Sequence, residues 1–194
     1  MVNPVPVPFA GGNTSDQVFQ PSTQELEIEF AENFTKLQGK FSFCTNMEEA
    51  VANLQALIQA RGWKKMFCVE QNLIQQMQTA GFHQANNFDL ATCDAAITTC
   101  EMLVARTGSM ILSSAQASGR TTSVYAPVHI CIAYTSQLVY DIKQALQNTK
   151  AKYSNQLPSL ITLATGPSRT ADIEKTLVVG VHGPKEVFCF LIDG

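Results

Sequence analysis

The sequence predicts an α/β protein with a largely parallel sheet. Short apolar runs typical of strands alternate with segments whose apolar residues recur at helical spacing. Such alternation favours strands joined by crossover helices rather than an all-α or all-β protein. The length of 194 residues is enough for one domain with a sizeable core. We expect a single domain over residues 22–194, preceded by a flexible arm over residues 1–21, which hold four prolines and a Gly-Gly pair.

The first half of the chain carries clear helix start and stop signals. Asn46 followed by Glu49 is a capping pattern, and Gly62 and Gly81 stand where helices end. The predicted elements are a helix at 22–37, a strand at 41–44, a helix from 46 to 62, a strand at 65–69 and a helix at 72–80.

The second half continues the alternation and closes on an apolar strand. The run at 128–134 is the strongest strand pattern in the chain, because nearly every residue in it is apolar. The predicted elements are a strand at 95–98, a helix through Arg106, a strand at 110–112, a loop or short helix at 113–125, a strand at 128–134, a helix at 136–152, a strand at 160–164, a short helix after Ser168 and a strand at 187–192.

Composition excludes several classes of function. The net charge of −3, from 13 Lys plus Arg against 16 Asp plus Glu, argues against a nucleic-acid binder, which usually has a basic surplus. No run approaches the roughly 18 apolar residues needed to span a bilayer. The first basic residue is Lys36 and three early prolines interrupt any apolar run, so we expect no signal peptide and a cytoplasmic protein.

The six cysteines do not form a metal-binding pattern. No Cys-x-x-Cys pair and no four-cysteine cluster is present, so we expect no metal and no iron–sulfur centre in this chain. Four of the cysteines lie inside apolar strand-like runs, where a thiol behaves as a small buried hydrophobe. Reduced thiols of this kind agree with a cytoplasmic location.

A turn at Gly166-Pro167 is the first candidate site. It follows the strand at 160–164 and precedes a predicted short helix that has Asp172 and Glu174 in its first turn. The first N–H groups of a helix have no internal partner, so a strand, a glycine turn and a helix start can bind an anion. Arg169 could add a bidentate contact, although a plain turn with a surface arginine is an open alternative.

A second turn, His182-Gly-Pro-Lys185, follows that predicted helix. His182 is the better placed of two candidate histidines, because His129 lies inside an apolar strand where a packed core residue is the simpler reading. The turn at Thr107 precedes a strand, so it could face the Gly166 turn only if strand directions are mixed there.

The two turns form a continuous signature. Thr165-Gly-Pro-Ser-Arg-Thr-Ala-Asp-Ile-Glu174 with Gly180-Val-His-Gly-Pro-Lys-Glu186 closely resembles the C-terminal signature of the lactate-utilisation (LUD) domain family. Further segments, at Ala96–Thr99, Thr107–Ser109 and Pro127–Ile130, follow the family's order and spacing. The resemblance covers roughly residues 25–194 and lies nearest the small C-type lactate utilisation proteins.

The resemblance implies a fold and a role. The fold would be Rossmann-like, with helices on both faces of a mostly parallel sheet, of the kind shared with ribose-phosphate isomerase, glucosamine-phosphate deaminase and CoA transferases. The role would be a non-redox subunit in L-lactate oxidation to pyruvate, beside partner subunits that carry iron–sulfur clusters. The chain departs from the family at Arg106, where an acid is usual, at Ser109, where Thr is frequent, and at Glu101, where Asp is frequent.

The candidate residues support two functions that the sequence leaves open. One is the lactate-utilisation subunit, which binds a small carboxylate or other anion. The other is a stand-alone isomerase or CoA-transferase-like enzyme acting on a sugar phosphate or acyl-CoA, with a carboxylate as base or nucleophile. Glu101 tests the second, although a solvent-facing helical glutamate is the simpler reading. A ligand-sensing module is a third, weaker reading. The candidate ligand-binding residues are Thr107, Gly108, Ser109, Gly166, Ser168, Arg169, Thr170, Gly183 and Lys185, and the candidate catalytic residues are Asp172, Glu174, His182 and Glu101.

Overall fold

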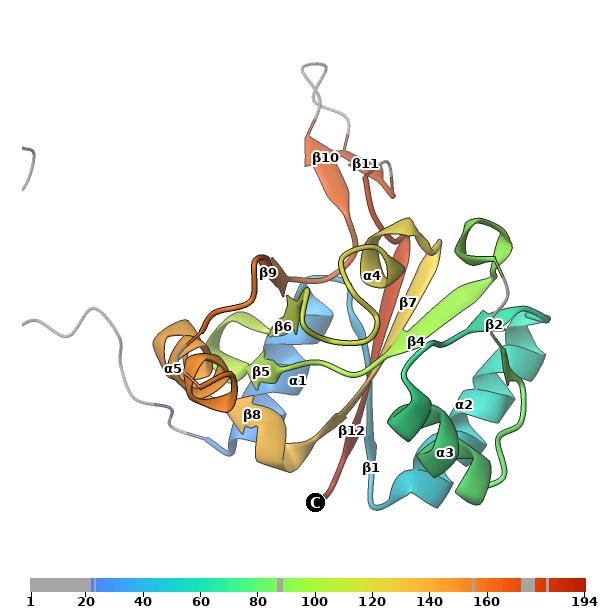
Figure 1. Cartoon of the computed structure of the whole chain (residues 1–194), viewed down its shortest axis with the longest axis horizontal. Helices are drawn as coiled ribbons and strands as arrows, with labels where there is room; N and C mark the ends of the chain where they lie inside the picture. Colours follow the sequence, from blue (N-terminus) through green and yellow to red (C-terminus); the bar gives the residue numbers. More distant parts are fainter. Residues whose placement is uncertain (1–21, 23, 87–88, 155, 172–176, 181) are drawn as a thin grey trace, which may run out of the picture.

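The computed structural model describes residues 22, 24–86, 89–154, 156–171, 177–180 and 182–194 (Figure 1). Its centre is a six-stranded sheet in which every pair of neighbouring strands is parallel. This confirms the predicted α/β class with a largely parallel sheet. The strands in order across the sheet are β1 (Lys40–Cys44), β12 (Glu186–Ile192), β7 (Val128–Tyr134), β4 (Ala95–Thr98), β2 (Met66–Phe67) and β3 (Ala85–Asn86).

Both faces of this sheet are covered. Helices α2 (Met47–Arg61) and α3 (Gln71–Thr79) pack on one face, while α1 (Leu26–Lys36) and a second sheet pack on the other (Figure 1). The residues of β7 alternate between the two cores: Ile130 and Ile132 face the α2 side, and Cys131 and Ala133 face the α1 side. A nearly continuous apolar strand is therefore needed here, because each face is buried.

The second sheet is mixed in direction. Its order is β8 (Leu138–Val139), β5 (Met102–Val104), β6 (Ser109–Ser113) and β9 (Ile161–Ala164). β6 runs antiparallel to both of its neighbours, and α5 (Ile142–Lys152) shares a small apolar core with the outer face of this sheet. The smaller elements are α4 (Thr122–Tyr125), 3-10 turns at Leu90–Thr92, Ala105–Thr107 and Thr135–Gln137, and a hairpin of β10 (Arg169–Ala171) and β11 (Leu177–Val179).

The capping signals around α2 are confirmed. The Asn46 side chain accepts a hydrogen bond from the Glu49 backbone N–H at 2.8 Å, and Gly62 ends the helix in the left-handed conformation with φ of 68°. We expect Asn46→Ala to lower the free energy of unfolding by about 1 kcal/mol, because the N–H at the helix start then loses its partner. Urea unfolding would check this value, and an unchanged midpoint would contradict it.

Three predicted helices are wrong in whole or in part. The segment before Arg106 is strand β5 and a 3-10 turn, because Leu103 and Val104 pair with β6 and β8. The predicted helix at 136–152 begins only at Ile142, where the Asp141 side chain caps it. Where a short helix was predicted after Ser168, Arg169–Ala171 form strand β10, which pairs antiparallel with β11, and residues 172–176 of that segment lie outside the described residues.

All six cysteines are free and buried. Across the described ranges, no group of three or more His, Cys, Asp or Glu side chains is arranged to hold a metal ion. A helix that is both long and apolar enough to cross a membrane is also not found in those ranges.

Candidate functional site

The turn at Thr107, which precedes β6, and the turn at Gly166, which follows β9, lie side by side. Because β6 and β9 are antiparallel, the start of β6 meets the end of β9, and the hydroxyls of Ser109 and Thr165 are 2.8 Å apart. Thr107 joins them through a 2.8 Å bond from the Ser109 hydroxyl. Strand directions are thus mixed at this point, which is the condition under which the Thr107 and Gly166 turns were expected to meet.

The glycines of both turns pack against helix α1. Gly108 has φ of 58°, and a Cβ atom there would lie 2.4 Å from the Phe34 backbone nitrogen. Gly166 has φ of 70°, and a Cβ atom would lie 2.3 Å from the Leu37 carbonyl oxygen. Both positions therefore need glycine for conformation and for space. This packing gives the two motifs a structural reason that does not depend on a ligand.

The polar groups after Gly166 are partly used inside the protein. The Ser168 N–H donates to the Pro184 carbonyl at 3.0 Å, and Arg169 donates from Nη2 to the Leu37 carbonyl at 3.3 Å near the C-terminus of α1. Since strand β10 follows the turn, a helix N-terminus is not present there to bind an anion. Asp172 and Glu174 lie outside the described residues, as does the side chain of Thr170, so their predicted roles stay predictions.

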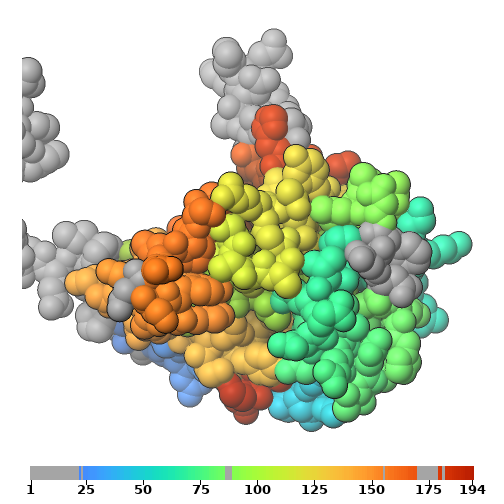
Figure 2. All heavy atoms as spheres, in the orientation of Figure 1, coloured from blue at the N-terminus to red at the C-terminus, as the bar shows by residue number. Residues whose placement is uncertain are grey.

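The turn at His182–Lys185 lines a cavity, here named the amino-edge pocket. It has a volume of about 620 Å³ and is lined by the segments just before β4, β7 and β12. The hairpin of β10 and β11 projects beside these strand starts (Figure 1), and Figure 2 shows the same projection in space-filling form. Three predicted site residues, His182, Gly183 and Lys185, contribute to the wall of the pocket. Gly183 also links it to the first turn, because a Cβ atom there would lie 2.9 Å from the Ser168 Cβ. The lining residues are Ala91, Thr92, Cys93, Val124, Tyr125, Ala126, Pro127, Gly180, His182, Gly183 and Lys185.

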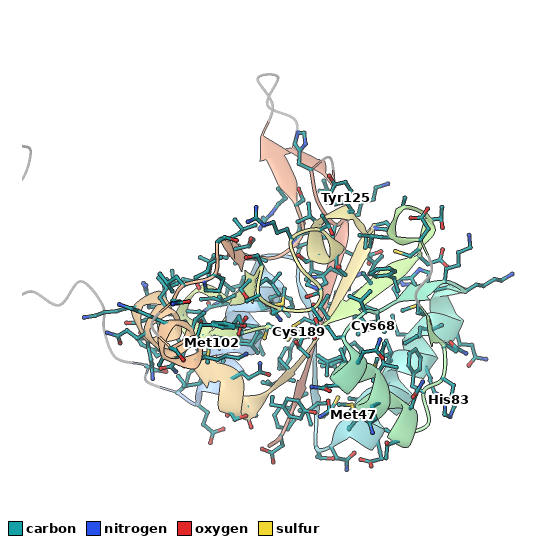
Figure 3. The ribbon with its side chains drawn as sticks, in the orientation of Figure 1. Met47, Cys68, His83, Met102, Tyr125 and Cys189 are labelled. Atoms are coloured by element: carbon teal, nitrogen blue, oxygen red, sulfur yellow. The ribbon has the colours of Figure 1, made fainter. Side chains whose placement is uncertain are left out.

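The charge of this pocket favours an anion. His182 and Lys185 are both exposed, and none of the described residues that line the pocket is acidic. Tyr125 adds a ring that is 71% exposed and lies below the hairpin in Figure 3. A basic side chain beside a hydroxylated, partly apolar wall can hold a small carboxylate.

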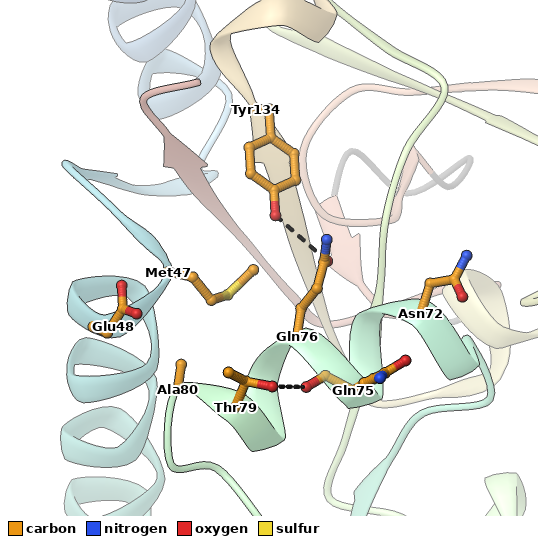
Figure 4. A pocket seen from close by; sticks show the side chains of 8 residues that line it. All are labelled: Met47, Glu48, Asn72, Gln75, Gln76, Thr79, Ala80 and Tyr134. Carbon is orange, nitrogen blue, oxygen red and sulfur yellow. Dashed lines mark hydrogen bonds between the residues drawn. The ribbon is translucent and has the colours of Figure 1, made fainter.

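A second pocket does not share this character (Figure 4). It lies between α2, α3 and the end of β7, and its described lining contains the acid Glu48 but no Lys, Arg or His. Two of its polar groups are already bonded within the protein: Thr79 donates to the Gln75 carbonyl at 3.0 Å, and the Tyr134 hydroxyl lies 3.4 Å from Gln76 Oε1. We therefore do not assign the anionic ligand to it.

Glu101 does not line the amino-edge pocket and is not the solvent-facing helical residue that the sequence suggested. It sits in the bend between β4 and β5, and its side chain is fully buried. The side chains of Lys152, Ser113 and Tyr153 donate to its carboxylate at 2.7, 2.5 and 2.6 Å. Burial alone would raise the pKa of Glu101, but these three hydrogen bonds outweigh it and hold the pKa below its usual value. The arrangement suits a structural charge better than a nucleophile.

We expect Lys152→Met to lower the free energy of unfolding by about 2 kcal/mol at pH 7, because a buried carboxylate loses its counter-charge. The figure is below that of a fully buried pair, since Lys152 is half exposed. Glu101 should then take up a proton more readily, so the loss should be smaller at pH 4.5 than at pH 7. Urea unfolding at both pH values would check this, with Lys150→Met on the same helix as the control. A loss that does not depend on pH would contradict it.

His129 is a core residue, as the simpler reading held. It is buried on β7, and its Nε2 lies 2.8 Å from the Thr98 hydroxyl. The Thr98 hydroxyl donates to the Thr99 carbonyl, so Nε2 is the donor to Thr98. Burial lowers the pKa of His129 to about 4.

Comparisons with known proteins agree with this fold. The model of the LUD domain family matches residues 28–192. The relatives include an uncharacterised protein of Neisseria meningitidis serogroup B, 36% identical over 99 residues, which are 51% of this chain and 42% of that protein. Lactate utilization protein C of Macrococcus caseolyticus is 36% identical over 112 residues (56% and 48%), and that of Bacillus subtilis is 37% identical over 102 residues (52% and 42%). The matched part thus spans less than half the length of these curated relatives.

A solved structure has the same fold. The crystal structure of a DUF162 family protein from Deinococcus radiodurans superposes with a TM-score of 0.61 at 18% identity, covering 86% of this chain and 96% of that one. The superposition supports the architecture of this chain. Because the family match extends over nearly all of the described fold, the chain belongs to the LUD domain family.

Proposed function

We propose that this chain acts in lactate utilisation and binds a small carboxylate in the amino-edge pocket. The relatives named lactate utilization protein C support the role. The observation that carries the ligand is the charge of the pocket: two basic side chains of the signature turn, His182 and Lys185, share a wall that has no acidic residue among its described members. L-Lactate and pyruvate are both small carboxylates of a size that a cavity of about 620 Å³ accepts.

The sequence predicts the ligand at the Gly166–Arg169 turn, whereas the amino-edge pocket lies next to that turn. Ser168 and Arg169 already bond to Pro184 and Leu37, which leaves them less able to hold a ligand. Pro184 directly precedes Lys185, so the hydrogen bond from the Ser168 N–H to the Pro184 carbonyl helps to hold the His182–Lys185 turn in place. We assign Lys185 as the main carboxylate contact and His182 as a second donor.

The binding experiment compares Lys185→Met with Lys150→Met. We expect L-lactate or pyruvate, titrated by calorimetry, to bind the intact chain and the Lys150→Met control equally, and to bind Lys185→Met at least tenfold more weakly. A charged hydrogen bond is worth about 1.5 to 3 kcal/mol, which corresponds to a factor of this size. Equal binding to both variants, or no binding of either acid to the intact chain, would contradict the carboxylate site.

We further propose that the chain is a subunit without a redox centre and that partner subunits supply iron–sulfur clusters. The absence of Cys-x-x-Cys motifs in the sequence supports this division. Affinity purification from the native host should recover iron–sulfur proteins with the chain, and deletion of its gene should abolish growth on L-lactate. Recovery of the chain alone, with unchanged growth on lactate, would overturn the assignment.

A further inference from the structure

A further cavity, distinct from the amino-edge pocket and from the pocket of Figure 4, lies at the opposite edge of the central sheet and is here named the carboxyl-edge cleft. It has a volume of about 400 Å³ and opens where β2 and β4 end. The chain leaves β2 through α3, which packs on one face of the sheet, and leaves β4 toward β5, which packs on the other. Parallel sheets bind ligands in the crevice formed where neighbouring connections diverge in this way. The cleft therefore occupies the position at which this fold most readily builds a site.

A continuous chain of hydrogen bonds forms the polar wall of the cleft. Glu70, only 8% exposed, accepts from the Thr99 N–H at 3.1 Å and from the Thr99 hydroxyl at 2.5 Å. Gln116 donates to the same hydroxyl at 3.2 Å, and its Oε1 accepts from the Ser113 N–H at 2.9 Å. The Ser113 hydroxyl in turn donates to Glu101, which fixes the chain to the ion pair. The carboxylate and the amide are thus held in defined orientations before any ligand arrives.

The far wall adds the end of α5. Lys152 and Tyr153 both line the cleft and both donate to the buried Glu101. An ammonium has three N–H donors, and Glu101 uses one of those on Lys152, so others can reach a bound molecule. The Tyr153 hydroxyl has its hydrogen directed at Glu101 and presents its oxygen lone pairs as acceptors.

The charges of these groups decide the class of ligand. Glu70 and Glu101 are two carboxylates against the single ammonium of Lys152, so an isolated anion would meet more negative than positive charge. The wall instead mixes strong acceptors, from Glu70 and Tyr153, with donors, from Gln116 and Lys152. A hydroxyl group both donates and accepts, so neighbouring hydroxyls can satisfy such a mixed wall. Further amides from Gln71 and Asn72 extend the same chemistry.

We propose that the carboxyl-edge cleft is a binding site for a polyhydroxylated small molecule, with Glu70 accepting from one hydroxyl and Gln116 and Lys152 donating to its neighbours. The site is separate from the amino-edge pocket and does not depend on lactate. Its residues come from segments after β2, β4 and β6 and from the end of α5, so no single sequence motif predicts the cleft.

Saturation-transfer NMR with the uncharged probes D-ribose, D-glucose, glycerol and D-sorbitol tests this proposal on the full chain. We expect transfer to at least one of these probes, reduced at least fivefold in Glu70→Gln and in Gln116→Ala. The control is Gln78→Ala, an exposed residue of α3 that lines neither cavity. Glu70→Gln keeps the size of the side chain and one acceptor for Thr99, and a thermal melt confirms that each variant is folded.

Competition separates this site from the carboxylate site. Inorganic phosphate at the concentration of the probe should leave the transfer unchanged, and Lys185→Met should leave it unchanged as well. No transfer to any of the four probes, equal transfer in Glu70→Gln and Gln78→Ala, or displacement by phosphate would each overturn the proposal. Loss of lactate binding in Lys185→Met with no effect on the polyol probes would support two distinct sites.

Discussion

Gly108→Ala is expected to destabilise the protein by about 2 to 4 kcal/mol. A non-glycine residue in the left-handed conformation costs about 1 kcal/mol, and φ at Gly108 is 58°. The added methyl would also lie 2.4 Å from the Phe34 nitrogen, 2.6 Å from the Asn33 carbonyl carbon and 2.8 Å from the Phe34 Cα. These are backbone atoms of α1, which cannot move without shifting the helix, so overpacking adds about 1 to 3 kcal/mol.

The matched control for this prediction is Gly62→Ala. Gly62 has φ of 68°, but a Cβ atom there would meet nothing within 4 Å. The two substitutions share the conformational strain and differ in the contact, so the control should cost only about 1 kcal/mol. Chemical unfolding of both variants gives the difference directly. Equal losses in the two variants would show that α1 does not pack against the Thr107 turn as described.

The glycines of the family signature have a structural role in packing against α1. The Asn33 side chain donates to the carbonyls of Ala105 and Arg106 at 2.9 and 3.2 Å, so α1 also contacts the Thr107 turn through hydrogen bonds. Gly166 approaches Leu37 in a similar way. Gly108 and Gly166 are thus explained by the close packing of α1 against two turns, without an anion. The basic residues later in the signature, His182 and Lys185, are the better candidates for binding a ligand.

The alternation of strands and helices in the central sheet could be predicted from the sequence, because those elements carry unambiguous signals. β7 is apolar throughout, and α2 has both its N-cap, Asn46, and its C-terminal glycine. The second sheet could be predicted only in part: the strands expected at 110–112 and 160–164 correspond to β6 and β9, whereas β5 and β8 were expected to be helical. Short runs such as Met102–Val104 and Leu138–Val139 fit a helix or a strand equally well, and only their pairing with each other and with β6 decides between them.

The candidate sites were predictable to different degrees. His182 and Lys185 stand in one short turn, so their common pocket follows from local sequence. The carboxyl-edge cleft joins Glu70, Thr99, Gln116 and Lys152, which are far apart in the chain and meet only through the fold. Glu70 directly follows the strand predicted at 65–69, within which the structure has β2. Its position after a buried strand in a parallel sheet is the one clue that could have singled it out.

The pH dependence of stability should be dominated between pH 6.5 and 4 by His129. The unfolded chain binds a proton at His129 near pH 6.5, whereas the buried ring does so only near pH 4. A folded pKa below the unfolded value means that the stability is fully present above pH 6.5 and is lost as the pH falls toward 4. A difference of this size corresponds to a loss of about 3 kcal/mol, because each pKa unit is worth about 1.4 kcal/mol.

The control is His129→Gln, which keeps a donor for Thr98 and cannot titrate. Its absolute stability will differ from that of the unchanged chain, so the quantity to compare is the slope of the free energy of unfolding against pH from 6.5 to 4.5. The variant should lack most of the slope. Glu101 contributes in a lower window, because its lowered pKa makes it lose stability only as the pH falls below about 4.5, and it does so in both proteins. Parallel slopes would show that the His129 ring is hydrated in solution, and that β7 and β4 separate at this point more easily than their packing indicates.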